Sequence, residues 1–435
     1  MTRPSVAGRL ISVAGGRGTV GGVSSPGADP RAGRDRVVVV GASLAGLRAV
    51  EELRRLGYDG EVVVVRAEAH APYDRPPLSK EVLAGEADAE DTVLRRQPLD
   101  ELDARWLLGR AAVGLDVATR TVTLDDGTSV TGSRGVVVAT GASPRLLPGT
   151  PALPGIHVLR TLDDCLALRA ELDQGPARVV VVGAGFIGAE VAATCRGRHL
   201  AVTVLEALPS PMVRGLGETL GDVLGSMHLD HGVDLRTGVG VAAFEGGARV
   251  ERVRLADGTI IDADVVLVGV GVVPNTDWLE SSELVLDDGV VCDETLLAAP
   301  GVVAAGDVCR WPNRLFDGAP MRLEHWTNAT EQGVAAAATL LAGEGNAKSY
   351  EPVPFVWSDQ YDMKIQCVGH FSGDDDLAIV DGSLEDRRFV AAFGRNGRLV
   401  GAVGFGRPRV VMQYRRMIAE HSSWDHALEL AEVAT

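Results

Sequence analysis

The sequence has few cysteines, and their spacing excludes two classes of small-domain architecture. The five cysteines are far apart, contain no CxxC pair and are odd in number. This pattern argues against a disulfide framework and against a zinc site, and it predicts a cytoplasmic protein with reduced thiols. No cysteine precedes Cys165. Aromatic residues are also scarce, at 4% of the chain.

Long apolar runs and an excess of positive charge are also missing. No apolar run approaches the roughly 18 residues that a membrane-spanning helix needs, so none is predicted. The first residues mix arginine and glycine where a signal peptide would need a continuous apolar core. With 42 Lys and Arg against 59 Asp and Glu, the net charge is −17. Such a chain repels phosphate backbones, which argues against nucleic acid as a partner.

What the chain does contain is a pattern of strand, glycine-rich turn, helix and strand that occurs twice. Residues 36–40 read RVVVV and lead through GASLAG and a helical period to EVVVV, and residues 178–206 repeat the pattern around GAGFIG. Continuous valine runs indicate strands that are buried on both faces of a parallel sheet. Each copy continues through an Asp-Gly hairpin to another strand. The duplication predicts an α/β fold with two Rossmann-like dinucleotide-binding domains.

The two ends of the chain differ from this pattern. Residues 1–34 are rich in Gly, Arg, Ser and Pro without hydrophobic periodicity, and we predict a disordered leader there. Residues 352–409 alternate short β-rich runs with turns, and two helical segments follow them. We predict a C-terminal α+β domain built on an antiparallel sheet over residues 342–435.

The second glycine-rich turn is a complete GxGxxG made by Gly183, Gly185 and Gly188. The glycines allow a tight turn, close approach of the backbone to a pyrophosphate, and close packing of the helix on the strand. Glu206 ends the following strand, where it would accept hydrogen bonds from a ribose 2′-hydroxyl and repel a 2′-phosphate. This site therefore favours NAD over NADP. The alternative is an acid that merely ends a strand.

The first turn is a variant in which Ser43 replaces the middle glycine, between Gly41 and Gly46. Its place between a buried strand and a helix still predicts a dinucleotide site, with Glu68 as the acid for the ribose. Two such folds in one chain predict two dinucleotides.

At this point the sequence resembles the FAD-dependent pyridine-nucleotide reductases, and within them the NADH-dependent ferredoxin reductases that serve oxygenases. The resemblance extends over about residues 35–423. It is carried by the stretches PYDRPPLSK (72–80), ATGASPRLLPG (139–149), VLRTLDD (158–164), GVVAAGDVC (301–309), RLEHWTNATEQG (322–333), VWSDQY (356–361) and GRLVGAVGFGRPRVVMQYRRMI (397–418).

The resemblance implies a division of the chain and a set of site residues. It implies a discontinuous FAD-binding domain over 35–148 and 265–341, and an NAD-binding domain over 149–264. The residues implied for FAD are Gly41, Ala45, Gly46, Glu68, Lys80, Val113, Thr140, Gly141, Arg160, Asp307 and Trp326. Those implied for NAD are Gly183, Gly185, Gly188, Glu190, Glu206 and Gly271.

The resemblance also implies a catalytic pair, Lys80 and Glu190, beside the flavin where nicotinamide stacks. Glu190 is expected on the first turn of the helix that follows the NAD motif. A cation there would favour the electron-rich reduced flavin, and the carboxylate would offset the cost of burying it. The alternative is a solvated lysine and an acid that complements the helix dipole.

The missing thiols bear on the electron acceptor. Many relatives in the wider superfamily pass electrons to a cysteine just after the first strand–helix–strand unit, which this chain lacks. Electrons would then leave singly from the flavin to a [2Fe–2S] ferredoxin, which would feed a haem-thiolate monooxygenase or a Rieske-type oxygenase. A rubredoxin reductase, an NADH oxidase and a flavin-bearing NAD-binding regulator without turnover remain as alternatives.

One stretch of charge could contribute a docking face. Residues 387–416 contain eight arginines and no Asp or Glu, inside a chain of net charge −17. A basic face could steer an acidic ferredoxin. The alternative is that these arginines pair with acids from elsewhere in the chain.

Overall fold

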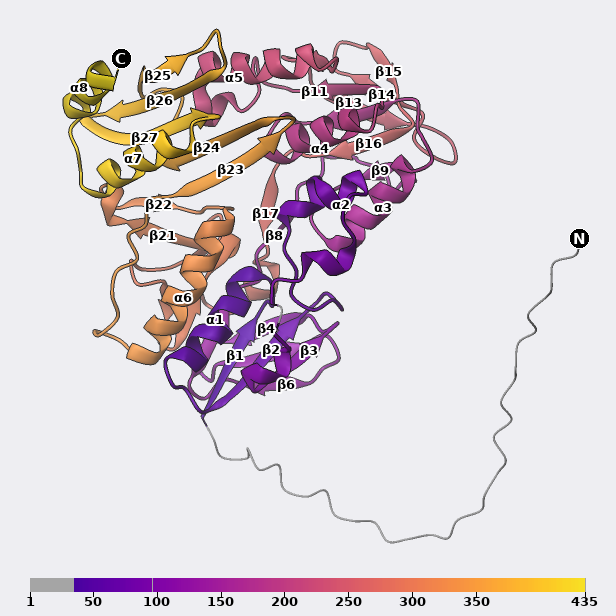
Figure 1. Ribbon diagram of the computed structural model, residues 1–435. Helices are drawn as coiled ribbons and strands as arrows, with labels where there is room; N and C mark the ends of the chain where they lie inside the picture. The colour runs from indigo at the N-terminus through magenta and orange to yellow at the C-terminus, as the bar shows by residue number, and fades with distance from the viewer. Residues whose placement is uncertain (1–34, 96, 435) are drawn as a thin grey trace, which may run out of the picture. The chain divides into compact units, whose positions relative to one another are not determined.

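The computed structural model describes residues 35–95 and 97–434, so the leader expected at 1–34 lies outside the described residues. Asp35–Thr435 is one compact unit. None of the helices within the described ranges is long and apolar enough to cross a membrane. Three large sheets organise this unit (Figure 1): a six-stranded sheet that is parallel except for its edge strand, a five-stranded parallel sheet and a five-stranded antiparallel sheet.

The first sheet has six strands in the order β19-β20-β7-β1-β2-β3. The valines of β1, inside this sheet, are at most 2% exposed, which confirms the expected strand buried on both faces. Helices α1 and α6 pack against each other beside this sheet. They are so close that a Cβ at Gly333 of α6 would lie 2.3 Å from the carbonyl oxygen of Ala45 in α1. The elements are β1 (Arg36–Val40), α1 (Leu44–Arg55), β2 (Glu61–Arg66), β3 (Ala104–Leu108), β7 (Gly135–Val138), β19 (Leu297–Ala299), β20 (Val302–Ala304) and α6 (Trp326–Ala342).

The second sheet repeats this design with five parallel strands in the order β12-β11-β10-β16-β9. Its elements are β9 (Ile156–His157), α3 (Leu162–Leu172), β10 (Val179–Val182), α4 (Phe186–Gly197), β11 (Val202–Leu205), α5 (Val213–Asp230), β12 (Asp234–Arg236) and β16 (Val265–Val268). The expected boundary at residue 265 is too early, because β16 pairs with β10. The chain returns toward the first sheet only after β16.

Shorter strands connect these sheets. The two Asp-Gly hairpins form as expected, one within β4-β5-β6 and one within β13-β14-β15. An antiparallel pair, β8 with β17, marks where the chain crosses between the two large sheets. The bounds are α2 (Glu81–Ala84), β4 (Ala112–Asp116), β5 (Thr121–Leu124), β6 (Ser129–Thr131), β8 (Ala142–Pro144), β13 (Val241–Glu245), β14 (Arg252–Leu255), β15 (Ile260–Asp262), β17 (Val272–Pro274), β18 (Val290–Val291), β21 (Cys309–Asn313) and β22 (Ala319–Met321).

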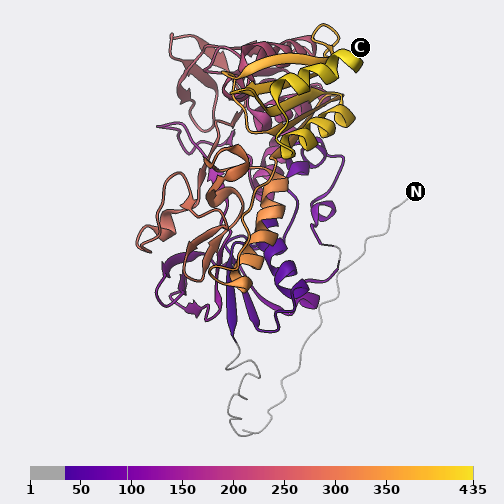
Figure 2. The ribbon, with the colours of Figure 1, turned by 90° about the vertical axis from the view of Figure 1, so that its left-hand side faces the viewer.

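The C-terminal section is the expected antiparallel sheet, in the order β23-β24-β27-β26-β25. Helix α7 packs on β24 and β27, and α8 packs on β25 and β26 (Figure 2, yellow). Its elements are β23 (Phe355–Gln360), β24 (Met363–Gly369), β25 (Asp376–Ser383), β26 (Arg388–Arg395), β27 (Arg398–Phe405), α7 (Pro408–Ala419) and α8 (Trp424–Ala434).

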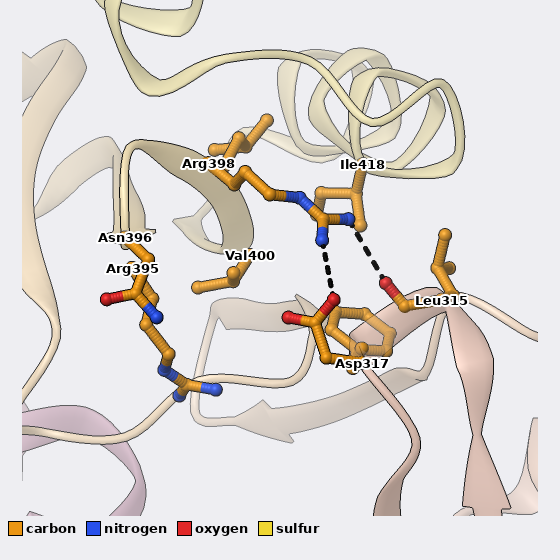
Figure 3. A pocket seen from close by; sticks show the side chains of 9 residues that line it. Leu315, Asp317, Arg395, Asn396, Arg398, Val400 and Ile418 are labelled. Carbon is orange, nitrogen blue, oxygen red and sulfur yellow. Dashed lines mark hydrogen bonds and ion pairs between the residues drawn. The ribbon is translucent and has the colours of Figure 1, made fainter.

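One polar contact joins this sheet to the loop between β21 and β22. Arg398 at the start of β27 forms an ion pair of 3.0 Å with Asp317 and donates to the Leu315 carbonyl oxygen at 3.3 Å (Figure 3). Asp317 is 82% exposed, so this pair orients the contact more than it stabilises it.

Two glycines of α4 provide a matched test of the second dinucleotide fold. A Cβ at Gly188 would lie 2.0 Å from the Gly183 carbonyl oxygen, whereas a Cβ at Gly197 would meet nothing within 4 Å. We expect Gly188→Ala to destabilise the protein by about 1–3 kcal/mol, because the helix must move away from the strand. Gly197→Ala should stabilise it by up to about 1 kcal/mol through helix propensity. Thermal unfolding measures both, and equal effects of the two substitutions would contradict this packing.

Candidate functional site

A buried ion pair lies where the two dinucleotide folds meet the C-terminal sheet. The Lys80 ammonium is 2.7 Å from Oε2 of Glu190, and the side chains are 15% and 5% exposed. The same carboxylate accepts a hydrogen bond from the Ser79 hydroxyl at 2.5 Å and another from the Ser358 hydroxyl at 2.7 Å. The expected pairing of Lys80 with Glu190 is therefore present, and the solvated alternative does not hold.

The position of Glu190 in its helix corrects one expectation. Helix α4 begins at Phe186 and has no acid in its first turn, so Glu190 lies in the second turn. The helix dipole acts mainly within the first turn, so it cannot be the main partner of this carboxylate. Lys80 and the two serine hydroxyls take that role.

The acid expected to hold the FAD ribose lies at the end of β2 among cations. Glu68 is 3.2 Å from Arg66 and 3.0 Å from Arg75, and it accepts a hydrogen bond from the Tyr73 hydroxyl. Burial alone would raise the pKa of Glu68, but the charges of Arg66 and Arg75 outweigh it and keep the pKa below its usual value. Glu68 is thus a carboxylate ready to accept hydroxyl hydrogen bonds.

Two further polar contacts involve residues of the expected FAD set. Arg160 forms an ion pair with Asp307 at 2.5 Å, and Asp307 lies in a short 3-10 helix, Gly306–Val308. The Trp326 indole N–H donates to Asp74 at 2.7 Å, although burial raises the pKa of that carboxyl. Trp326 thus contacts the segment that leads from Tyr73 to Lys80. Arg160 contacts it as well, because the Arg160 carbonyl oxygen accepts a hydrogen bond from Arg75 at 2.5 Å.

Thr140 and Gly141 lie at the crossing between the two sheets, next to Asn275. The Asn275 amide donates to the Thr140 carbonyl oxygen at 2.8 Å, and the Asn275 backbone N–H donates to the Gly141 carbonyl oxygen at 2.9 Å. Val113 differs from the other expected residues. Its side chain lies on β4 and is 52% exposed, so the structure does not bring it into the buried cluster.

A cavity of about 810 Å³ lies at the carboxyl ends of β10 and β11, where the NAD site is expected. It is lined by Gly183, Gly185, Glu206 and Gly271, and also by Arg145 and Arg214. Glu206 accepts hydrogen bonds from the backbone N–H groups of Ala184 at 2.8 Å and Leu208 at 2.9 Å, which fixes its carboxylate at the rim of the glycine turn.

The residues present fit two bound dinucleotides. A Cβ at Gly185 would meet nothing within 4 Å, so a backbone surface stays open toward the cavity at the start of α4. Arg66, which donates to Ala42 of the first glycine turn, and His325, which lines the cavity, each have a buried ring or guanidinium nitrogen (Nε and Nδ1) without a hydrogen-bond partner within the described part of the chain. Helix α1 has no acid in its first turn and no side-chain cap, which leaves its N–H groups available to phosphate.

The cysteines are not present as reactive thiolates. Cys367 lines the cavity beside Glu206, but burial raises its pKa to about 12. All five are buried free thiols. Burial raises the pKa of Cys165 to about 11 and that of Cys195 to about 12, so neither is a thiolate at neutral pH.

The arginines of residues 387–416 are mostly paired. Five of the eight form ion pairs with acids from other segments: Arg387 with Asp230, Arg395 with Asp375, Arg398 with Asp317, Arg407 with Asp381 and Arg415 with Glu331. Within the described residues, the other three arginines form no ion pair and are exposed: Arg388 on β26, and Arg409 and Arg416 on α7. The basic surface is thus narrower than the sequence indicated.

Several residues of the site were not identified from the sequence. Ser79 could have been inferred because it is adjacent to Lys80 in the sequence, but Ser358 and Asn275 come from distant segments. A period of two along β23 could have indicated one of them, because Ser358 and Gln360 are buried while the residues between and before them are partly exposed.

Comparisons with known proteins agree with this geometry. Residues 35–333 match the family described as pyridine nucleotide-disulphide oxidoreductase, and residues 355–434 match the reductase C-terminal family. Rhodocoxin reductase of Rhodococcus erythropolis is 36% identical over 387 residues, covering 88% of this chain and 89% of that protein. The ferredoxin–NAD(+) reductase component of a p-cumate 2,3-dioxygenase system from Pseudomonas putida is 35% identical, covering 90% and 94%. A crystal structure of the covalent putidaredoxin reductase–putidaredoxin complex matches with a TM-score of 0.85 and 31% identity, covering 92% of this chain and 98% of that one.

The Arg160–Asp307 contact generates a stability prediction. Arg160→Ala would leave the Asp307 carboxylate, 11% exposed, without its cation, and should lower the free energy of unfolding by about 3 kcal/mol. The control is Arg178→Ala, which breaks exposed pairs with Asp262 and Asp264 and should change stability little. Chemical denaturation of both variants measures the difference. Equal losses of unfolding free energy in the two variants would show that the buried pair stabilises the protein no more than an exposed one.

Proposed function

Because the chain belongs to the pyridine nucleotide-disulphide oxidoreductase family, we propose that it is an NADH-dependent ferredoxin reductase that uses FAD. It takes hydride from NADH and passes electrons one at a time to a [2Fe–2S] ferredoxin, which feeds a haem-thiolate monooxygenase or a Rieske-type oxygenase. The observation that supports this most is the buried Lys80–Glu190 pair between two dinucleotide folds, in a chain whose thiols are all buried. We place the reaction in the cytoplasm, where thiols stay reduced.

The proposed division of the chain keeps three domains and moves one boundary. An FAD-binding domain is built on the first sheet, an NAD-binding domain on the second sheet including β16, and a reductase C-terminal domain on the antiparallel sheet. Lys80 and Asp307 come from the first of these, and Glu190 and Glu206 from the second.

Each part of the site has a separate task in this proposal. FAD, when bound, supplies the capacity to accept a hydride and to release single electrons. Glu68 and the start of α1 hold its ribose and phosphates, and Asp307 and Trp326 line the flavin side. The cavity beside Glu206 holds NADH. Glu190 keeps the Lys80 ammonium at a fixed point between these two sites, where a positive charge favours the reduced flavin.

The test of the proposed function is direct. The protein should purify yellow with non-covalent FAD, and NADH should reduce ferredoxin in its presence. Peroxide formation at the same rate without ferredoxin would favour an NADH oxidase, and faster reduction of rubredoxin would favour a rubredoxin reductase. A protein that binds both cofactors without turnover would be a regulator.

Cofactor preference follows from Glu206. Because this carboxylate repels a 2′-phosphate, we expect NADH to be strongly preferred over NADPH, and Glu206→Arg should shift the preference toward NADPH. The ratio of kcat/KM for the two cofactors measures this. Glu218→Arg on α5 is a control for the added charge, since Glu218 does not line the cavity. Wild-type protein that uses both cofactors equally well would contradict the role of Glu206.

The exit of electrons is proposed near α7. A series of ring contacts leads there from Trp326: Trp326 to Trp357 at 6.2 Å, Trp357 to Phe355 at 6.0 Å, and Phe355 to the Arg415 guanidinium at 5.6 Å. Arg409 and Arg416 are exposed on the same helix. An acidic ferredoxin docked on α7 would therefore lie close to the flavin side of the site.

A pair of charge reversals tests this docking face. Arg409→Glu with Arg416→Glu should raise the KM for ferredoxin about tenfold at low salt, and the effect should fade as salt screens it over roughly 10 Å. Reduction of the flavin by NADH should not change. Arg105→Glu on β3, also exposed, is the matched control. An equal effect of the control, or no effect of the double variant, would place the docking face elsewhere.

A further inference from the structure

A run of buried polar side chains leads away from the Lys80–Glu190 pair into the C-terminal sheet. Glu190 is 4% exposed, Ser358 and Gln360 are 0% exposed, and His228 of α5 is 3% exposed. A buried polar group without a partner costs about 1–3 kcal/mol, so such a run persists only when each member is satisfied. The run joins the NAD-binding section to the C-terminal domain at the site of the proposed chemistry.

The hydrogen bonds in this run have one consistent direction. The Gln360 amide N–H donates to the Ser358 hydroxyl oxygen at 3.2 Å, which leaves the Gln360 carbonyl oxygen facing His228 Nε2 at 3.2 Å. An acceptor at that position requires a proton on Nε2. His228 Nδ1 then accepts from the Tyr361 hydroxyl at 2.8 Å. Burial lowers the pKa of His228 to about 4, so the ring is neutral at neutral pH and has a single proton to place.

Ser358 is the last member of the run before the ion pair. Its hydroxyl oxygen accepts from Gln360, so its only proton is directed to Oε1 of Glu190 at 2.7 Å. The other carboxylate oxygen, Oε2, contacts Lys80 at 2.7 Å and Ser79 at 2.5 Å. With Oε1 held by Ser358, the carboxylate cannot rotate away, and Oε2 keeps facing the ammonium.

We propose that Ser358, with Gln360 and His228 behind it, is a positioning residue for the Lys80–Glu190 pair. The C-terminal domain thereby completes the side of the site that accepts hydride, in addition to any part it has in docking. This inference rests on the proposed function, because the pair has a catalytic role only if NADH reduces a bound flavin. The direction of the hydrogen bonds does not depend on that function and is tested separately.

The kinetic test compares three variants in anaerobic stopped flow with NADH. Ser358→Ala should lower the limiting rate of flavin reduction about tenfold, as expected for a lost hydrogen bond to a charged group, while the Kd for NADH changes little because the cavity is untouched. Ser358→Thr keeps the hydroxyl and should recover most of the rate. Ser383→Ala is the control, because Ser383 ends β25, the opposite edge strand of the same sheet, and donates to the Asp386 carboxylate. FAD content and thermal unfolding verify that each variant folds.

A second measurement needs no turnover. Nitrogen NMR of histidine-labelled protein, assigned with His228→Gln, should show His228 as a neutral ring protonated at Nε2. A proton on Nδ1 would reverse the run and overturn the proposal. A wild-type rate in Ser358→Ala, or an equal loss in Ser383→Ala, would also overturn it. Wild-type flavin that NADH does not reduce contradicts the proposed function itself, and the NMR result then decides the direction of the run alone.

Discussion

The buried carboxylate of Glu190 is the constraint on which the rest of the site depends. Removing an ionised group from water costs several kcal/mol, and a single cation rarely compensates for it. Here the compensation for Glu190 on α4 comes from two other sections of the chain: Ser79 and Lys80, which follow β2, and Ser358 on β23. None of the sections satisfies the carboxylate alone, so this contact favours one relative placement of all three and fixes a positive charge where they meet.

This arrangement separates the entry of electrons from their exit. The cavity beside Glu206 lies at the carboxyl ends of β10 and β11, whereas Trp326 and the ring contacts through Trp357 lead toward α7. Both directions start from the segment between Asp74 and Lys80, because Asp74 accepts from Trp326 and Lys80 contacts Glu190. Since every cysteine is buried, the chain offers no thiol relay between the two sides. A one-electron carrier that docks from outside suits such a site better than a dithiol.

Local patterns were sufficient to predict most of the fold. The valine runs of β1 and β10, the two glycine turns and the Asp-Gly hairpins are short-range features, and the structure confirms each of them. Contacts between distant segments were harder to predict. From the sequence, residues 265–268 were assigned to the FAD-binding domain. Only the pairing of β16 with β10 shows that they belong to the second sheet. The arginines after residue 387 suggested a basic face, yet five of them meet acids that lie far away in sequence. Ser358 contacts Glu190 across 168 positions, a separation that no local pattern reports.

The most direct test of this account is the reduction of bound flavin by NADH in Glu190→Gln, measured by anaerobic stopped flow. Glutamine keeps the shape of the side chain and removes its charge, so Lys80 loses its ionic partner while the cavity for NADH stays intact. The account predicts that flavin reduction slows by about tenfold or more, with FAD content unchanged and with ferredoxin still oxidising the reduced flavin at the wild-type rate. Flavin reduction at the wild-type rate in this variant would contradict the central role of the Lys80–Glu190 pair.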